Sequence, residues 1–154
     1  MINLTTRLKA ARALLGLAVA CGALLALTPR WLLPVCADKV KTAAGGLTPM
    51  RCAWSANVLI ALGVVAVVLA VVGLLTRSGT ALGMNALALT CIFALAILVP
   101  TKLIGVCGAP THPCRAATLP AVLAVAGLGL LVSVAAGVLV TRSIGRREAE
   151  VPQR

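Results

Sequence analysis

Two stretches of the chain repeat the same residue types around a cysteine. One runs from Leu27 to Cys36 and the other from Leu98 to Cys107. The matched pairs are Leu27 and Leu98, Pro29 and Pro100, Leu32 and Leu103, Val35 and Val106, and Cys36 and Cys107. Each copy is followed by a second cysteine beside an arginine, in Arg51-Cys52 and in Cys114-Arg115. Cysteines in such matching places can form disulfides, exchange them, or hold a metal ion.

Structural disulfides are the favoured interpretation of these four cysteines, provided that they face an oxidising compartment. Four cysteines allow three pairings. Pairing within each loop, Cys36 with Cys52 and Cys107 with Cys114, treats the two halves alike and requires the least of the geometry. Each bond would restrain a loop rich in Gly and Pro, contributing about 2–3 kcal/mol. The sequence therefore favours two stapled loops.

A redox function is the first alternative for the same residues. Cys36, Cys52, Cys107 and Cys114 would then be catalytic thiols, with Arg51 and Arg115 stabilising neighbouring thiolates. Four spans with two outward cysteine pairs are architecturally similar to quinone-linked membrane thiol-disulfide oxidoreductases, which would make a quinone the cofactor. The absence of a Cys-x-x-Cys motif argues against this alternative.

A metal site is the second alternative. Soft sulfur and imidazole ligands suited to Cu(I) or Zn would come from Met50, Cys52, Cys107, His112 and Cys114. Their spacing matches no strong zinc motif, and oxidised cysteines cannot bind a metal.

The elements that position these residues are apolar spans. The chain has 154 residues, of which 61% are hydrophobic, with a mean hydropathy of +1.10. We therefore expect an all-α polytopic protein with one integral membrane domain over residues 1–154. Its four helices are predicted at about 10–29, 53–76, 79–100 and 118–141, and the repeat suggests two parallel two-helix units. Within these spans, Cys21 and Cys91 are interpreted as small buried hydrophobic residues.

Charge predicts the topology. Of the 14 basic residues, six lie in loops 30–52 and 101–117, and the others lie before the first span, in the turn near Arg77 and in the tail 142–154. The positive-inside rule then favours cytoplasmic termini and extracytoplasmic loops in the cytoplasmic membrane. The amino-terminal apolar run could alternatively be a signal peptide, which would leave the loops outside as well. The longer first loop, with Asp38, Lys39 and Lys41, is the expected contact for a partner protein.

Several function classes are excluded. Only Asp38, Glu148 and Glu150 are acidic, so paired-carboxylate catalysis lacks its groups. The chain has no phosphate-binding glycine motif and no nucleophilic serine elbow. The basic residues flank membrane spans, so nucleic acid is not an expected partner.

Around the cysteines the chain resembles a known family. The segments Met50 to Ser55, Pro100 to Cys107 and His112 to Arg115, followed by Pro120, are similar to the hallmarks of the bacterial membrane-protein family called domain of unknown function 4418. The resemblance implies a four-helix protein of no established activity, sometimes found near export-type ABC transporters. We therefore expect a non-enzymatic accessory subunit whose partners are the lipid bilayer and an ABC exporter. The family often has His and Met where this chain has Ala53 and His112.

Overall fold

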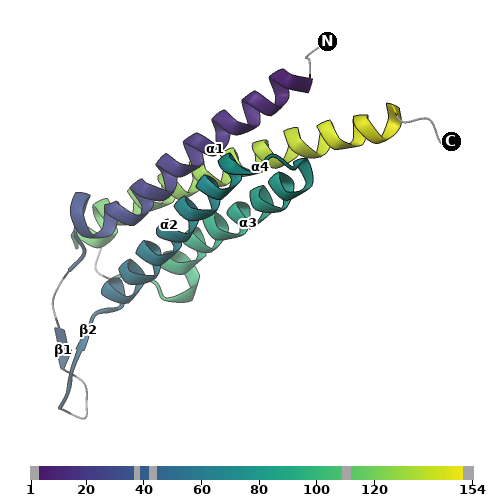
Figure 1. Ribbon diagram of the computed structural model, residues 1–154. Coiled ribbons are helices and arrows are strands. Elements are labelled where there is room, and N and C mark those ends of the chain that lie inside the picture. The colour runs from purple at the N-terminus through teal and green to yellow at the C-terminus, as the bar shows by residue number, and fades with distance from the viewer. Residues whose placement is uncertain (1–3, 37–38, 42–44, 109–111, 151–154) are drawn as a thin grey trace.

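Four long helices form the protein, as the sequence predicted. The computed structural model describes residues 4–36, 39–41, 45–108 and 112–150 (Figure 1). The helices are α1 (Leu4–Leu27), α2 (Arg51–Leu75), α3 (Gly79–Leu98) and α4 (Leu119–Glu150). Each helix contributes to a segment that is long and apolar enough to cross a membrane. The chain is therefore a multi-pass membrane protein of the all-α class.

Three short π-helical turns and one β-hairpin complete the described chain. The turns are η1 (Thr28–Leu32), η2 (Val99–Leu103) and η3 (Cys114–Thr118), and the strands β1 (Lys39–Lys41) and β2 (Leu47–Pro49) pair antiparallel. The hairpin was not predicted, because three-residue strands are too short to show an alternating pattern. The fourth helix runs to residue 150, whereas the sequence analysis predicted a tail from residue 142. The helix can continue because no proline lies between residues 121 and 151.

Prolines produce the two equivalent turns η1 and η2. Pro29 and Pro100 each lie near the start of a turn and have no backbone N–H to donate. The hydrogen bonds therefore reach one residue further back, from Leu33 N to Thr28 O at 2.8 Å and from Ile104 N to Val99 O at 2.9 Å. In both copies the chain consequently leaves its helix through the same widened turn.

The four helices form a ring in which each packs against two neighbours. α1 contacts α2 and α4, and α3 contacts the same two helices. We call the end of the bundle that carries η1, η2, η3 and the hairpin the loop end; the start of α1 and the end of α4 lie at the opposite end (Figure 1). In each of the pairs α1–α2 and α3–α4, the first helix therefore runs toward the loop end and the second runs away from it. We refer to these pairs as the first and second repeat.

Small residues permit close packing within each repeat. A Cβ atom at Gly63 of α2 would lie 2.6 Å from Ala26 N and 2.8 Å from Gly22 O, so the backbones of α1 and α2 touch. Phe93 occupies the position equivalent to Gly22, and its ring packs on Gly129 of α4. Glycines thus permit close contact in both repeats, with small residues on both helices of the first repeat and a large ring on α3 in the second.

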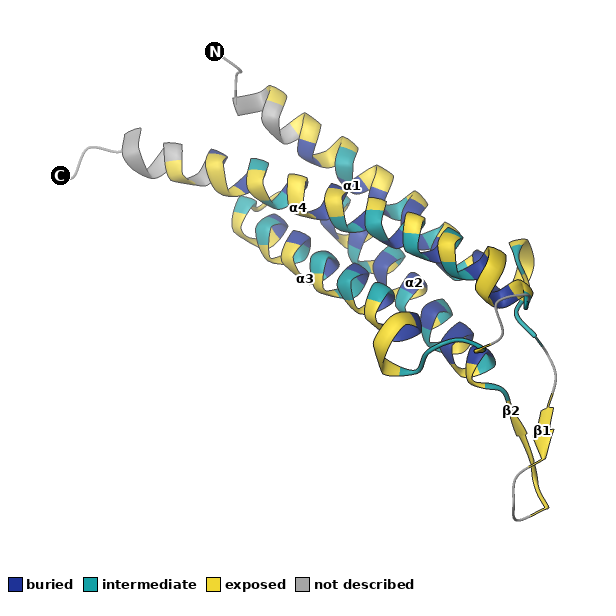
Figure 2. Cartoon of the chain, turned by 180° about the vertical axis from the view of Figure 1, so that it is seen from behind, coloured by how far each residue is buried: buried dark blue, intermediate teal, exposed yellow. Residues whose placement is uncertain are grey.

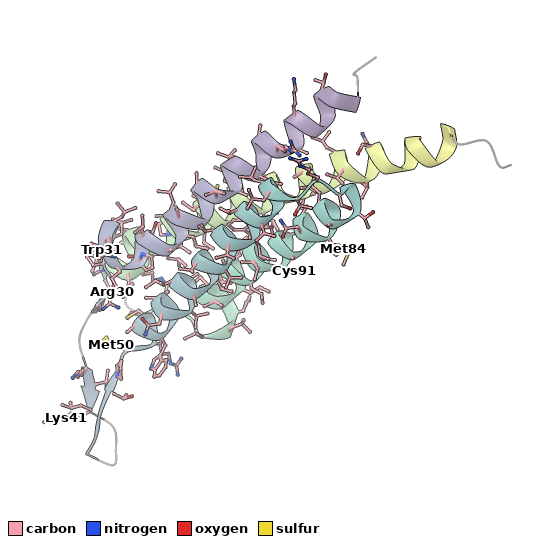
Figure 3. The ribbon with its side chains drawn as sticks, in the orientation of Figure 1. Arg30, Trp31, Lys41, Met50, Met84 and Cys91 are labelled. Atoms are coloured by element: carbon pink, nitrogen blue, oxygen red, sulfur yellow. The ribbon has the colours of Figure 1, made fainter. Side chains whose placement is uncertain are left out.

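Burial follows the ring. Buried residues line the inner faces of the helices, and exposed apolar residues cover the outer faces, where lipid would contact them (Figure 2). Cys21 is buried at 2% exposure, as expected. Cys91 is exposed on the outside of α3 (Figure 3), which corrects the expectation that it is buried by protein. Its position on the outer face of the helix makes it a lipid-facing residue.

Candidate metal centre

The four loop cysteines meet in one group at the loop end. The Sγ atoms of Cys36, Cys52, Cys107 and Cys114 all lie within 4.8 Å of one another, and we call this group the cysteine cluster. Cys36 follows η1, Cys52 is the second residue of α2, Cys107 follows η2, and Cys114 opens η3. Four separate segments, two from each repeat, therefore contribute one sulfur atom each.

Two sulfur–sulfur contacts in the cluster join the two repeats. Cys107 Sγ lies 3.2 Å from Cys52 Sγ, and Cys36 Sγ lies 3.9 Å from Cys114 Sγ. All four residues are thiols in this structure. The pairing expected from the sequence, Cys36 with Cys52 and Cys107 with Cys114, stays a prediction.

The cluster follows the symmetry of the repeats. Cys52 and Cys114 occupy equivalent positions and are 0% and 1% exposed, whereas the equivalent Cys36 and Cys107 are half-buried. Burial raises the pKa of the Cys107 thiol, and its hydrogen bond with Cys52 raises it as well. The repeat relation therefore pairs the two buried cysteines with each other and the two half-buried cysteines with each other.

Two buried hydroxyl groups hold the cysteine-bearing segments together. Ser55 Oγ of α2 donates to the carbonyl of Gly105 at 2.7 Å, and Thr118 Oγ1 of η3 donates to the carbonyl of Leu33 at 3.0 Å. Gly105 has a φ of +83°, a conformation that glycine adopts without steric cost, and it turns the chain toward Cys107. We call these two hydrogen bonds the hydroxyl clasps, since each joins one repeat to the other.

The clasp residues were missed by the sequence analysis. Ser55 lies three residues after Cys52 and Thr118 four residues after Cys114, so each hydroxyl is about one helical turn beyond a motif cysteine. That spacing is the signal that could have identified them.

The candidate metal ligands are brought together only in part. His112 Nδ1 lies 3.6 Å from Cys36 Sγ, so the histidine reaches the edge of the cluster. Met50 precedes α2 at the loop end (Figure 3), and within the described residues no hydrogen-bond contact joins it to the four cysteines. Cys36, which the metal alternative left out, belongs to the cluster. Arg115, proposed as a thiolate partner, donates from Nη1 to the carbonyl of Gly108 at 3.1 Å.

Two spaces adjoin the cluster. A cavity of about 20 Å³ is lined by residues of both repeats, including Pro29, Pro100, Cys52 and Cys114. This volume is about what one water molecule requires. A larger pocket of about 290 Å³ lies between the first loop and α2 and reaches Cys36. The cluster thus adjoins a small cavity beside Cys52 and Cys114 and a larger pocket beside Cys36.

The loop end is electropositive. Within residues 28–36, 39–41, 45–52, 99–108 and 112–118, every side chain that carries a full charge at neutral pH is Lys or Arg; Asp38 lies outside the described residues. At the Cys107 sulfur itself, however, burial is the largest effect, and it raises the pKa of that thiol, which favours its protonated form.

Comparison with known proteins assigns the chain to a family. No curated protein and no solved structure matches it. Residues 18–139 match the family described as Domain of unknown function (DUF4418). The matched range contains the four spans in large part, both cysteine loops and both clasps, so this chain belongs to the DUF4418 family.

Proposed function

We propose that the cysteine cluster binds one Zn²⁺ ion through four thiolates. The proposal is carried by the mutual approach of the four Sγ atoms to within 4.8 Å, with two separations of 3.2 and 3.9 Å. Tetrahedral zinc with Zn–S bonds near 2.3 Å holds its sulfur ligands roughly 3.8 Å apart. A small contraction or expansion of the observed group would therefore produce the geometry of a zinc site.

The ligand set is one that zinc binds in proteins. Four sulfur atoms in a tetrahedral arrangement are typical of Zn²⁺ or iron–sulfur centres. An iron–sulfur cluster with several iron atoms would need its cysteines farther apart, because sulfide ions lie between them. In this proposal Met50 and His112 are not ligands, and His112 instead contacts the sulfur of Cys36.

The role of such a site is structural. A zinc ion with four protein ligands has no open coordination position for a substrate. It would tie α2, η3 and both cysteine-bearing loops together at the loop end, where the loops have few buried apolar residues of their own. A zinc-stabilised loop end agrees with the non-enzymatic accessory role implied by the family resemblance.

Metal analysis tests the proposal directly. The full chain, purified in detergent under reducing conditions, is expected to contain one zinc ion per chain. Replacement of zinc by Co²⁺ should produce the intense visible absorption of tetrahedral cobalt thiolate. Cys52→Ser and Cys114→Ser should abolish both signals, whereas the matched control Cys91→Ser, which alters a cysteine outside the cluster, should leave them unchanged. A reduced, folded chain that binds neither metal would refute the zinc site.

We further propose that the loop end faces outward from the cytoplasmic membrane. The positive-inside rule supports this orientation through the basic residues of the turn and of the terminal segments. Thr48→Cys in the hairpin should react with a membrane-impermeant maleimide in intact cells, and Ser78→Cys in the α2–α3 turn only after permeabilisation; both residues are exposed. The reverse labelling pattern would overturn the orientation.

A partner protein would contact the hairpin in this orientation. β1 and β2 extend beyond the helices (Figure 1), and Lys39 and Lys41 are exposed on β1. Co-purification of a tagged chain with an ABC exporter, lost when both lysines are replaced by alanine, would support the partnership expected from the resemblance. Retention of the exporter by the double variant would exclude the hairpin as the contact.

A further inference from the structure

We infer that the cluster has a second, metal-free state in which disulfides join Cys52 to Cys107 and Cys36 to Cys114. Both bonds would cross between the two repeats. The pairing is argued from the geometry of the thiols alone, and only the accompanying release of zinc rests on the proposed function.

The sulfur–sulfur contacts that cross between the repeats are the first argument. The two crossed pairs are separated by 3.2 and 3.9 Å, so each must close by roughly 1–2 Å to reach the S–S bond length of about 2.05 Å. The repeat relation exchanges one crossed pair with the other, so the two bonds would occupy equivalent places in the repeats. Each pair also combines a buried with a half-buried cysteine, which gives an oxidant access to one sulfur of each pair.

The hydroxyl clasps are an independent argument. The clasp from Ser55 to Gly105 holds the segment of Cys52 against the segment of Cys107. The clasp from Thr118 to Leu33 likewise holds the segment of Cys114 against that of Cys36. The backbone is therefore already joined in the crossed arrangement before any covalent bond forms.

The oxidation balances with a two-electron acceptor for each bond. Two cysteine thiols lose two electrons and two protons as one S–S bond forms, and the acceptor takes up both. In the cell this acceptor would be the disulfide of a thiol oxidant, which is reduced to two thiols; in the test it is diamide, whose N=N bond is reduced to a hydrazine. Starting from the zinc form, the four thiolates supply four electrons to two acceptor molecules, and water supplies the protons that these acceptors take up. Zn²⁺ then leaves because disulfide sulfur cannot hold it.

This second state would preserve the connection between the repeats. Zinc joins the four segments in the reduced protein, and the crossed disulfides join the same segments after oxidation. The redox state of the compartment would consequently determine whether the loop end holds a metal ion, without releasing either loop from the bundle.

Deletion of a single cysteine distinguishes the three pairings. After treatment of the full chain with diamide, non-reducing proteolysis and mass spectrometry should find the two crossed links. Cys36→Ser should then leave one cluster thiol reactive toward maleimide: Cys114 for crossed pairing, Cys52 for pairing within the loops, and Cys107 for the third pairing. Reactive Cys52 or Cys107 would overturn the inference.

Two further measurements keep the test independent of folding and of zinc. The reciprocal variant Cys114→Ser should leave Cys36 reactive, and Cys91→Ser should leave both links unchanged. A chromogenic chelator should detect one zinc ion released for each two disulfides formed. A chain that carries no zinc before oxidation but forms the crossed links would refute the zinc site alone, whereas a zinc-loaded chain that forms other links would refute the crossed pairing alone.

Discussion

Removal of the hydroxyl clasps is expected to weaken zinc binding without removing a ligand. The donors Ser55 and Thr118 are 2% and 5% exposed, and their hydrogen bonds measure 2.7 and 3.0 Å. A buried hydrogen bond contributes about 0.5–1.5 kcal/mol net, and leaving its acceptor without a partner can cost up to about 3 kcal/mol. The acceptors belong to half-buried residues, Leu33 and Gly105, which water can partly reach. We therefore work with about 1 kcal/mol for each clasp.

This free energy should appear in the zinc affinity. Without a clasp, the cysteine-bearing loop must be ordered when the metal binds, so the cost is subtracted from the binding free energy. A loss of about 1 kcal/mol corresponds to a roughly fivefold higher dissociation constant, and about 2 kcal/mol to a roughly 30-fold one. Ser55→Ala and Thr118→Val are each expected to show the first value, and the double variant the second if the effects are independent.

Competition with a zinc chelator of known affinity measures these constants in the full chain. Thr118→Ser keeps the donor and should bind zinc like the original chain. Thr76→Val is the matched control, because Thr76 directly follows α2 and its Oγ1 donates at 2.8 Å to Val72 O of that helix, at the other end of the bundle. Dissociation constants unchanged in the clasp variants, or raised equally by Thr76→Val, would refute the view that the clasps preorganise the site.

Three other predictions concern stability, measured as the thermal unfolding midpoint in detergent. Gly63→Ala should lower the midpoint, because the new Cβ would meet the backbone of α1 and reduce the free energy of unfolding by about 1–3 kcal/mol. In the control Gly16→Ala the new Cβ has nothing within 4 Å, so the midpoint should not change. Equal midpoints for the two variants would exclude the close helix contact. Gly129→Ala should also lower the midpoint, because its Cβ would overlap the ring of Phe93. The control Gly127→Ala on the same helix has open space and should leave the midpoint unchanged. An unchanged midpoint in Gly129→Ala would contradict this packing. Chelation of zinc should lower the midpoint, since zinc at about 100 times its dissociation constant adds about 2.7 kcal/mol; variants that lack a cluster cysteine should not respond, and a response in them would place the zinc elsewhere.

Local features of the sequence predicted the fold well. The apolar spans indicated four helices, and the structure has four that are long and apolar enough to cross a membrane. Both longer loops, which are rich in Gly and Pro, leave their helices through π-helical turns rather than continuing as α-helix. The hairpin and the exposure of Cys91 were missed, since strand pairing and the rotation of α3 depend on neighbours that no local pattern names.

The candidate site was predicted only as a set of residues. The repeated motif brought Cys36, Cys52, Cys107 and Cys114 to notice, and all four belong to the cluster. Met50 was included among possible ligands and Cys36 was left out of that set, because spacing along the chain does not show which side chains converge. The clasp hydroxyls escaped notice because a serine or threonine near a helix start has many common roles.

The sequence by itself determined that four apolar helices cross a membrane and that both cysteine loops lie at one end of the bundle. These properties follow from hydrophobic length and from the alternation of helix direction, which are read along the chain. Only the tertiary structure decided that the four sulfur atoms form one group and that sulfur atoms of different repeats contact each other. That arrangement depends on α1 packing beside α4 and on clasps between residues 50 and 85 positions apart, so it exists only after the helices have closed into a ring.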